Sequence, residues 1–249
     1  MSKRIRVHAV VAALCALALG GCGGGGGGSS TPTTVMPPAG TTFPLGTAVA
    51  QLFTTGYQKT AVVSGTASSG GASYPVGGSV TLTDGAVGAA TTFAGQTALT
   101  STTTVTGSVT VNGQTLNLAT SEQDYVTTSY APLGYTSSTA YCVAPSPGVY
   151  PAQVSVGQTG TIGTYKCYTD STMAVPTGTE TLSYVVKAAN STTTAEVSII
   201  DSFVNTANQQ TSSGSSNYLI DTAGAVSLLS VAVLEQVSGI TLNLTFTAQ

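Results

Sequence analysis

From Lys59 to the last residue, hydrophobic residues alternate with Thr, Ser and Asn, so that the sequence has a period of two. Successive side chains of a β-strand point to opposite faces of the sheet, and this period therefore predicts strands with one buried face. Charged residues make up 6% of the chain, whereas a typical soluble protein has about 25%. Hydroxyl and amide side chains must therefore fill the solvent-facing positions.

Turn residues divide this region into antiparallel hairpins. Asn112-Gly113 predicts a two-residue turn between strands at 99–111 and 114–125. The other predicted strands lie at 60–67, 79–83, 181–188, 194–204, 216–221, 225–234 and 240–246. Because no helical spacers separate the strands, a parallel sheet is disfavoured. The predicted fold is all-β and mainly antiparallel, either a sandwich or an open barrel of long hairpins.

One helix is predicted ahead of the strands, between Pro44 and Gly56, with Thr47 as its candidate cap. The apolar residues of this segment recur at helical spacing: Leu45, Val49, Leu52 and Phe53. A membrane-lying helix would carry Lys or Arg on its polar face, and this segment has neither. The pattern therefore favours a helix docked on the sheet over a membrane-lying or lid helix.

A Pro-rich run at 145–151 interrupts the alternation. We predict one β domain over residues 41–249. The alternative is two related halves at 41–144 and 149–249, because similar Thr, Ser and Tyr residues precede a glycine in both segments.

The first 21 residues have the three parts of an export signal: a basic start, an apolar core at 9–19 and small residues at the end. The core is about eleven residues long, whereas a membrane-spanning helix needs roughly 20. The signal ends in Leu19-Gly20-Gly21-Cys22, which resembles the lipobox of bacterial lipoproteins. The alternative is an ordinary secretory signal with an incidental cysteine.

The resemblance implies that residues 1–21 are removed and that Cys22 becomes the acylated first residue, carrying palmitate or a similar chain. It implies attachment to a membrane through Cys22, and in this family Gly23 in place of Asp favours the outer membrane, facing the periplasm or the cell surface. Residues 22–40 are then a lipidated cysteine and a Gly/Ser/Pro tether. The mature region is similar to uncharacterised proteobacterial envelope lipoproteins with poly-glycine tethers, and this similarity implies no activity.

Cys142 and Cys167 are the two cysteines that remain after Cys22. The bacterial envelope outside the inner membrane is oxidising, so we predict that they form a disulfide. A loop of about 26 residues would contribute roughly 3.5 kcal/mol in the chain-entropy model. A metal-binding or reactive pair is disfavoured, because neither a Cys-x-x-Cys spacing nor a neighbouring His is present.

Composition excludes several classes of function. After Cys22 the chain has three lysines against nine acids, a net charge of −6 (3 minus 9), and it has no arginine or histidine. Nucleic-acid binding is therefore not expected. Ser-His-Asp and Cys-His catalysis and the usual zinc or iron sites also require residues that the mature chain lacks. We expect no enzyme activity, no cofactor and no metal.

The remaining chemical candidates are few. Glu122 and Asp124 form the closest acidic pair for glycoside chemistry, and together with Asp170 they could ligate calcium. The simpler interpretation of Glu122 and Asp124 is a solvent-facing polar pair near a strand end, and no calcium-loop motif is present. Lys59, Lys166 and Lys187 lack a Ser-x-x-Lys context. The eleven tyrosines could line a binding face, but strand tyrosines with half-buried rings explain them as well.

The sequence thus favours a non-enzymatic envelope lipoprotein whose β domain has a structural or protein-binding role. The alternative is a carrier of lipid or another hydrophobic ligand, since a helix followed by antiparallel strands resembles the half-barrel lipoprotein carriers of the bacterial envelope. Self-association through strand edges is also expected, because few charges guard those edges.

Overall fold

The computed structural model describes residues 35–249, so the predicted signal peptide, Cys22 and the first part of the tether lie outside the described residues. One helix, α2 (Leu45–Thr55), precedes the strands. The strands are β1 (Tyr57–Ser69), β2 (Ala72–Asp84), β3 (Ala90–Phe93), β4 (Gln96–Val111), β5 (Gln114–Val126), β6 (Pro132–Thr136), β7 (Tyr141–Val143), β8 (Thr159–Tyr168), β9 (Pro176–Ala188), β10 (Thr194–Asn205), β11 (Gln210–Asp221), β12 (Val226–Val237) and β13 (Ile240–Ala248).

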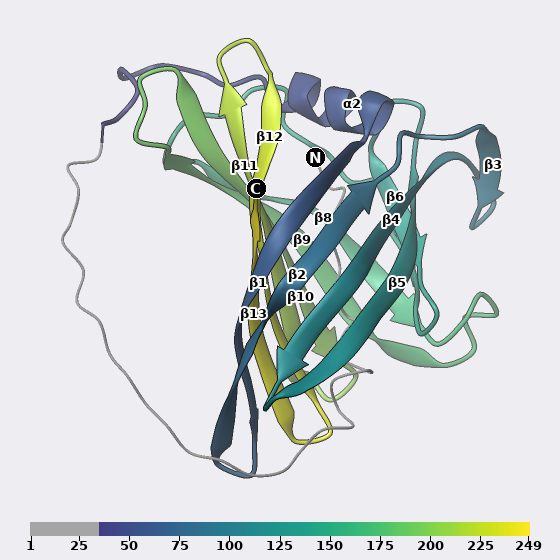
Figure 1. The fold of residues 1–249 in the computed structure, drawn as a ribbon. Coiled ribbons are helices and arrows are strands. Elements are labelled where there is room, and N and C mark those ends of the chain that lie inside the picture. The colour runs from purple at the N-terminus through teal and green to yellow at the C-terminus, as the bar shows by residue number, and fades with distance from the viewer. Residues whose placement is uncertain (1–34) are drawn as a thin grey trace.

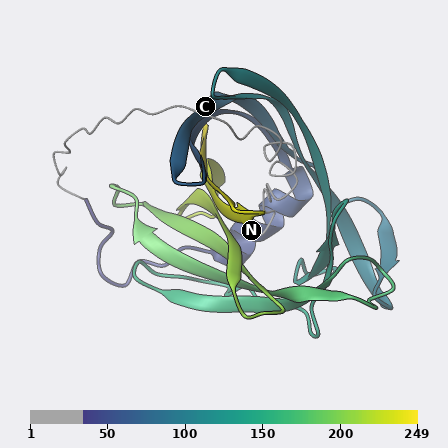
Figure 2. The same ribbon diagram turned by 90° about the horizontal axis from the view of Figure 1, so that it is seen from below.

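Twelve of these strands form a closed antiparallel barrel (Figures 1 and 2). Most neighbours in the barrel are also neighbours in sequence, and two pairings close the ring. The last strand, β13, pairs with β1, and β2 pairs with β4 from Val76 opposite Val111 to Asp84 opposite Thr103. The short strand β3 pairs with the first residues of β4 and stands outside the ring. Strands from residues 41–144 and from 149–249 therefore belong to one sheet.

The predicted all-β antiparallel class with one N-terminal helix is confirmed, and the barrel is closed rather than open. The Asn112-Gly113 turn joins β4 and β5 as predicted, with Asn112 and Gly113 both at positive φ (50° and 76°). Strands β3, β6, β7 and β8 were not predicted. Three of them have five residues or fewer, which is too short to show an alternating pattern.

Three glycines on neighbouring strands allow the sheet to coil tightly. Gly65, Gly78 and Gly107 lie on the interior-facing positions of β1, β2 and β4, each with φ between 146° and 159°. A Cβ added at Gly78 would lie 2.3 Å from the carbonyl oxygen of Ser108 on the neighbouring strand. Only glycine permits this approach of two backbones, and such positions mark sharp bends in barrels.

We predict that Gly78→Ala lowers the free energy of unfolding by about 2 kcal/mol or more, because both the φ angle and the contact with Ser108 become strained. Gly77→Ala is the matched control, since a Cβ there would lie 3.9 Å from its nearest neighbour, the Val63 carbonyl oxygen. Denaturant unfolding of both variants measures the difference. Equal stability of the two variants would contradict a special role for Gly78.

Helix α2 lies across one end of the barrel (Figure 1). The predicted apolar face of Leu45, Val49, Leu52 and Phe53 is buried, and Ala48 is buried with it. The helix begins after Pro44 without a side-chain cap, so the prediction that Thr47 caps it is wrong. Thr47 instead is the third residue of the helix, where its side chain is close to Gly224 in the β11–β12 turn. Gly56 ends the helix with φ 64°.

The main hydrophobic core fills the barrel interior beneath α2 and continues along the inward faces of the strands. A small second cluster of Phe93, Ala98 and Leu133 lies on the outer face, where β3 folds back over β4 and β6. Within residues 35–249, no helix combines the length and the hydrophobicity that crossing a membrane requires. Ring closure pairs each barrel strand on both sides. The expected self-association through strand edges stays a prediction, and β3, which pairs only with β4, offers an edge for it.

Candidate functional site

The barrel interior carries most of the acidic residues of the mature chain. Six of its nine acids are buried there at 9% exposure or less: Asp84, Glu122, Asp124, Glu180, Asp201 and Glu235. Each acid lies on the same face of its strand as buried hydrophobic residues. On β9, for example, Glu180 shares a face with Leu182, Tyr184 and Val186. Strand parity therefore sends these carboxyl groups inward, into the same space as the hydrophobic core.

The interior polar residues form rows that follow direct cross-strand pairing. One row crosses β1, β2, β4 and β5: Tyr57, Asp84, Thr103 and Glu122. A second crosses β4 to β8: Ser101, Asp124, Tyr135, Cys142 and Cys167. A third crosses β8 to β12: Tyr165, Glu180, Phe203, Ser212 and Glu235. Neighbouring residues of a row lie on strands about 4.8 Å apart, so their side chains contact one another.

At the end covered by α2, two aspartates share hydroxyl donors. Ser101 Oγ lies 2.6 Å from the carbonyl oxygen of Gly85 and 3.3 Å from Asp84 Oδ1. Thr103 Oγ1 lies between Asp84 Oδ1 at 3.5 Å and Asp124 Oδ2 at 3.4 Å. We call Asp84, Ser101, Thr103 and Asp124, together with Tyr57 and Tyr218, the α2-end site. Its hydroxyl groups lie within hydrogen-bond distance of the buried carboxyl groups, which need polar partners in a protein interior.

Two tyrosines of the α2-end site have strongly perturbed acidity. Burial raises the pKa of Tyr218 well above its usual range, and the nearby Asp84 carboxylate raises it further. Burial also raises the pKa of Tyr57, with contributions from Tyr218 and Asp84. Both phenols therefore stay protonated in the folded barrel at neutral pH.

These pKa shifts predict a loss of stability at alkaline pH. A phenol whose pKa is raised by folding stabilises the folded state fully below its ordinary pKa of about 10, and this contribution falls as the pH rises above it. We expect the free energy of unfolding to fall above about pH 10, and to fall less steeply in Tyr218→Phe. Urea unfolding at several pH values measures this slope.

The control is Tyr168→Phe, which removes a half-buried tyrosine from β8. It should keep the alkaline slope of the wild-type protein. A slope in Tyr218→Phe as steep as that of the wild type would show that Tyr218 does not couple folding to pH.

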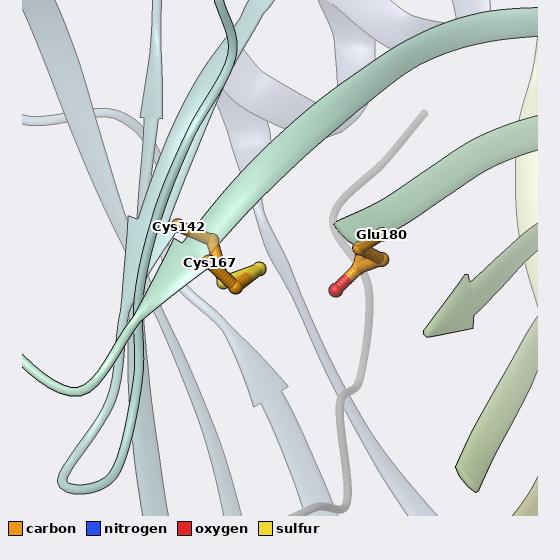
Figure 3. A group of neighbouring side chains, drawn as sticks. All are labelled: Cys142, Cys167 and Glu180. Atoms are coloured by element: carbon orange, nitrogen blue, oxygen red, sulfur yellow. A yellow bond between two sulfur atoms is a disulfide. The ribbon is translucent and has the colours of Figure 1, made fainter. Parts of the chain in front are cut away.

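Near the other end of the barrel, Cys142 on β7 and Cys167 on β8 are bonded as a disulfide, which confirms the predicted pair. Figure 3 shows Glu180 on β9 facing the two cysteines. Tyr135 donates a hydrogen bond to Glu180 Oε2 at 2.8 Å, and its hydroxyl lies 3.8 Å from Cys167 Sγ. Tyr165 packs edge-on against the Tyr135 ring at a centroid distance of 6.2 Å.

Cys142, Cys167 and Glu180 are also the group of three potential metal ligands that residues 35–249 provide, with ligand atoms within 4.8 Å of one another. Metals bind cysteine as the thiolate, and a disulfide offers none. In the oxidised protein this group is therefore a structural element and not a metal site.

A pocket of about 300 Å³ opens beside the disulfide, at the end of the barrel opposite α2. We call it the disulfide-end pocket. Its wall is formed by inward-facing residues of the second and third rows, namely Tyr135, Cys142, Cys167, Phe203, Ser212 and Glu235, and its rim by the β6–β7 turn and by Val237. The wall is thus largely apolar and aromatic, with one carboxyl group and a few hydroxyl groups, which is the usual make-up of a small-molecule site.

The other sequence candidates lie elsewhere. Glu122 and Asp124 are buried in the barrel, so the solvent-facing interpretation of this pair is wrong: ring closure turns their face of β5 inward. Asp170 is exposed on the turn between β8 and β9, and the structure does not bring it to that pair. Lys166 and Lys187 are exposed, and Lys59 is half-buried. Cys22 lies outside the described residues.

The sequence interpretation missed four acids as interior residues: Asp84, Glu180, Asp201 and Glu235. The alternating pattern contained the necessary signal. Extending the predicted strand at 181–188 back by one residue places Glu180 on the face of Leu182 and Tyr184, and Glu235 follows Val231 and Val233 at the same parity. Six acids on apolar faces indicate an enclosed polar interior.

The comparisons with known proteins are sparse. No protein-family model matches the chain, and no curated protein sequence matches it. One solved structure is similar, a protein from Bacteroides fragilis described as exported and as having a YmcC-like fold. The two chains are 9% identical, the match covers 79% of this chain and 96% of the other, and the TM-score is 0.30.

Proposed function

We propose that this chain is a bacterial envelope lipoprotein whose barrel is a non-enzymatic binding module for a small, partly hydrophobic ligand. The disulfide-end pocket is the observation that carries the proposal. It is a concave site of about 300 Å³ at the end of the barrel opposite α2, walled by aromatic and apolar groups. Ligand pockets commonly lie in the mouths of β-barrels.

The pocket favours a carrier over a purely structural domain. A structural barrel needs only a packed interior, which α2 and the hydrophobic core supply at the other end. Near the disulfide the described residues instead leave a pocket, and the disulfide links β7 covalently to β8 in the wall of that pocket. Rigid, preformed pockets reduce the entropic cost of binding.

Several sequence features support a role without catalysis and an address in the envelope. The mature chain has no histidine, so the common nucleophile and metal chemistries have no base or ligand. The motif ending in Cys22, followed by Gly23, supports acylation and sorting to the outer membrane. Acylation with more than one chain gives stable membrane attachment.

Acylation of Cys22 is tested by growing cells that express the full chain with labelled palmitate. We expect label in the wild-type protein, recovered with outer membranes, and none in Cys22→Ser. Cys15→Ser is the matched control, because this cysteine lies inside the predicted signal and should not affect labelling. Unlabelled wild-type protein, or labelled Cys22→Ser, would refute the anchor.

Ligand binding is tested by native mass spectrometry of residues 23–249, the mature chain without Cys22, exported to a bacterial periplasm by a signal without a lipobox. We expect a co-purified ligand at a fixed stoichiometry. Ala140→Trp should abolish it, because Ala140 lines the pocket at its rim and an indole ring there would fill the space.

Ser138→Trp is the matched control, since Ser138 is exposed in the same β6–β7 turn and does not line the pocket. It should keep the ligand. A wild-type protein that is consistently free of ligand would refute the binding role, and a ligand retained by Ala140→Trp would place it elsewhere.

A further inference from the structure

We propose that the ligand of the disulfide-end pocket is an organic cation, a protonated amine carried on an apolar body. This inference rests on the proposed function and names the chemical class of its ligand. It is carried by the cavity together with the charge and the rings that line it.

The apolar body of such a ligand has a matching wall. Phe203, Val237 and the disulfide of Cys142 and Cys167 present carbon and sulfur to the cavity. An alkyl or ring system placed there exchanges water for apolar surface, which is favourable at about 25 cal/mol per Å².

The cationic group has a matching carboxylate. Glu235 lines the pocket, and it is the direct cross-strand neighbour of Ser212, which in turn neighbours Phe203. A protonated amine at this position would meet a charged acceptor, a hydroxyl acceptor and an aromatic face together. Hydrogen bonds to charged groups and cation–π contacts both strengthen when water is excluded.

The surroundings favour the same sign of charge. Glu180 is fully buried next to Tyr135 in the pocket wall, where the phenol holds its carboxyl group at 2.8 Å. No lysine of residues 35–249 lines the cavity: Lys166 and Lys187 are exposed on outward faces, and the half-buried Lys59 lies near the start of β1, at the α2 end. The mature chain also carries a net charge of −6 (3 minus 9), which attracts cations over longer distances. The carboxylate of an anionic ligand such as a fatty acid would instead be repelled by the acidic side chains and by the net negative charge of the chain.

The inference is tested with three probes of equal chain length: octylammonium, octanoate and octanol. Isothermal titration of residues 23–249, the mature protein without Cys22, compares their affinities. We expect octylammonium to bind at least about tenfold more tightly than the other two, because only it forms a charge-assisted hydrogen bond with Glu235. This comparison uses the wild-type protein and does not depend on any variant folding.

Two variants locate the effect. Glu235→Gln removes the charge in the pocket and should weaken octylammonium binding about tenfold or more. Asp170→Asn removes one acidic charge from an exposed turn and should leave the affinity unchanged. The inference is wrong if octanoate or octanol binds as tightly as octylammonium, or if Glu235→Gln binds octylammonium like the wild type.

These outcomes separate the inference from the proposed function. Tight binding of octanoate or octanol would overturn the cation preference and leave the binding role intact. If none of the three probes binds, the inference is also wrong, and the co-purification experiment alone decides whether the barrel carries a ligand.

Discussion

Backbone pairing around a closed ring is the constraint from which the other properties of this barrel follow. Each barrel strand has a neighbour on both sides because β13 pairs with β1 and β2 pairs with β4. Proteins usually protect exposed strand edges with charged residues, and this chain has very few. Closure removes the need for them. It also demands strong coiling, which the glycines on β1, β2 and β4 permit by letting neighbouring backbones approach closely.

Closure also creates an interior, and the two ends of that interior are built differently. Helix α2 fills one end with apolar side chains, and beneath it the hydroxyls of Ser101 and Thr103 lie within hydrogen-bond distance of Asp84 and Asp124. The other end has no such plug among the described residues, and the disulfide holds its wall in place around a pocket. One end is thus occupied by the chain itself, whereas the other retains a space of ligand size.

Local signals made the hairpins and the helix predictable. Asn112 and Gly113 specify their turn because both residues readily adopt the positive φ that it requires. The helical spacing of the apolar residues of α2 can be read from the sequence without any tertiary contact. Ring closure was not predictable, because it depends on the pairing of β1 with β13 across almost the whole chain. The error over Glu122 and Asp124 has the same origin: alternation shows that they share a face, but only the closed ring determines which face is enclosed. The disulfide between Cys142 and Cys167 was predictable, because these are the two cysteines after Cys22 and the expected compartment is oxidising.

The described chain enters the barrel at the α2 end. The backbone N–H of Val35 donates to Asn190 Oδ1 in the β9–β10 turn, and Phe43 pairs with Val154 immediately before α2 begins. An acyl anchor at Cys22, as proposed, would thus hold the barrel by its closed end. The disulfide-end pocket would then open on the side away from the attachment point, toward ligands that arrive from the aqueous phase. The pocket lies at the end of the barrel away from this entry point, so a ligand that arrives through the aqueous phase, as a small organic cation would, can reach it without passing the anchor.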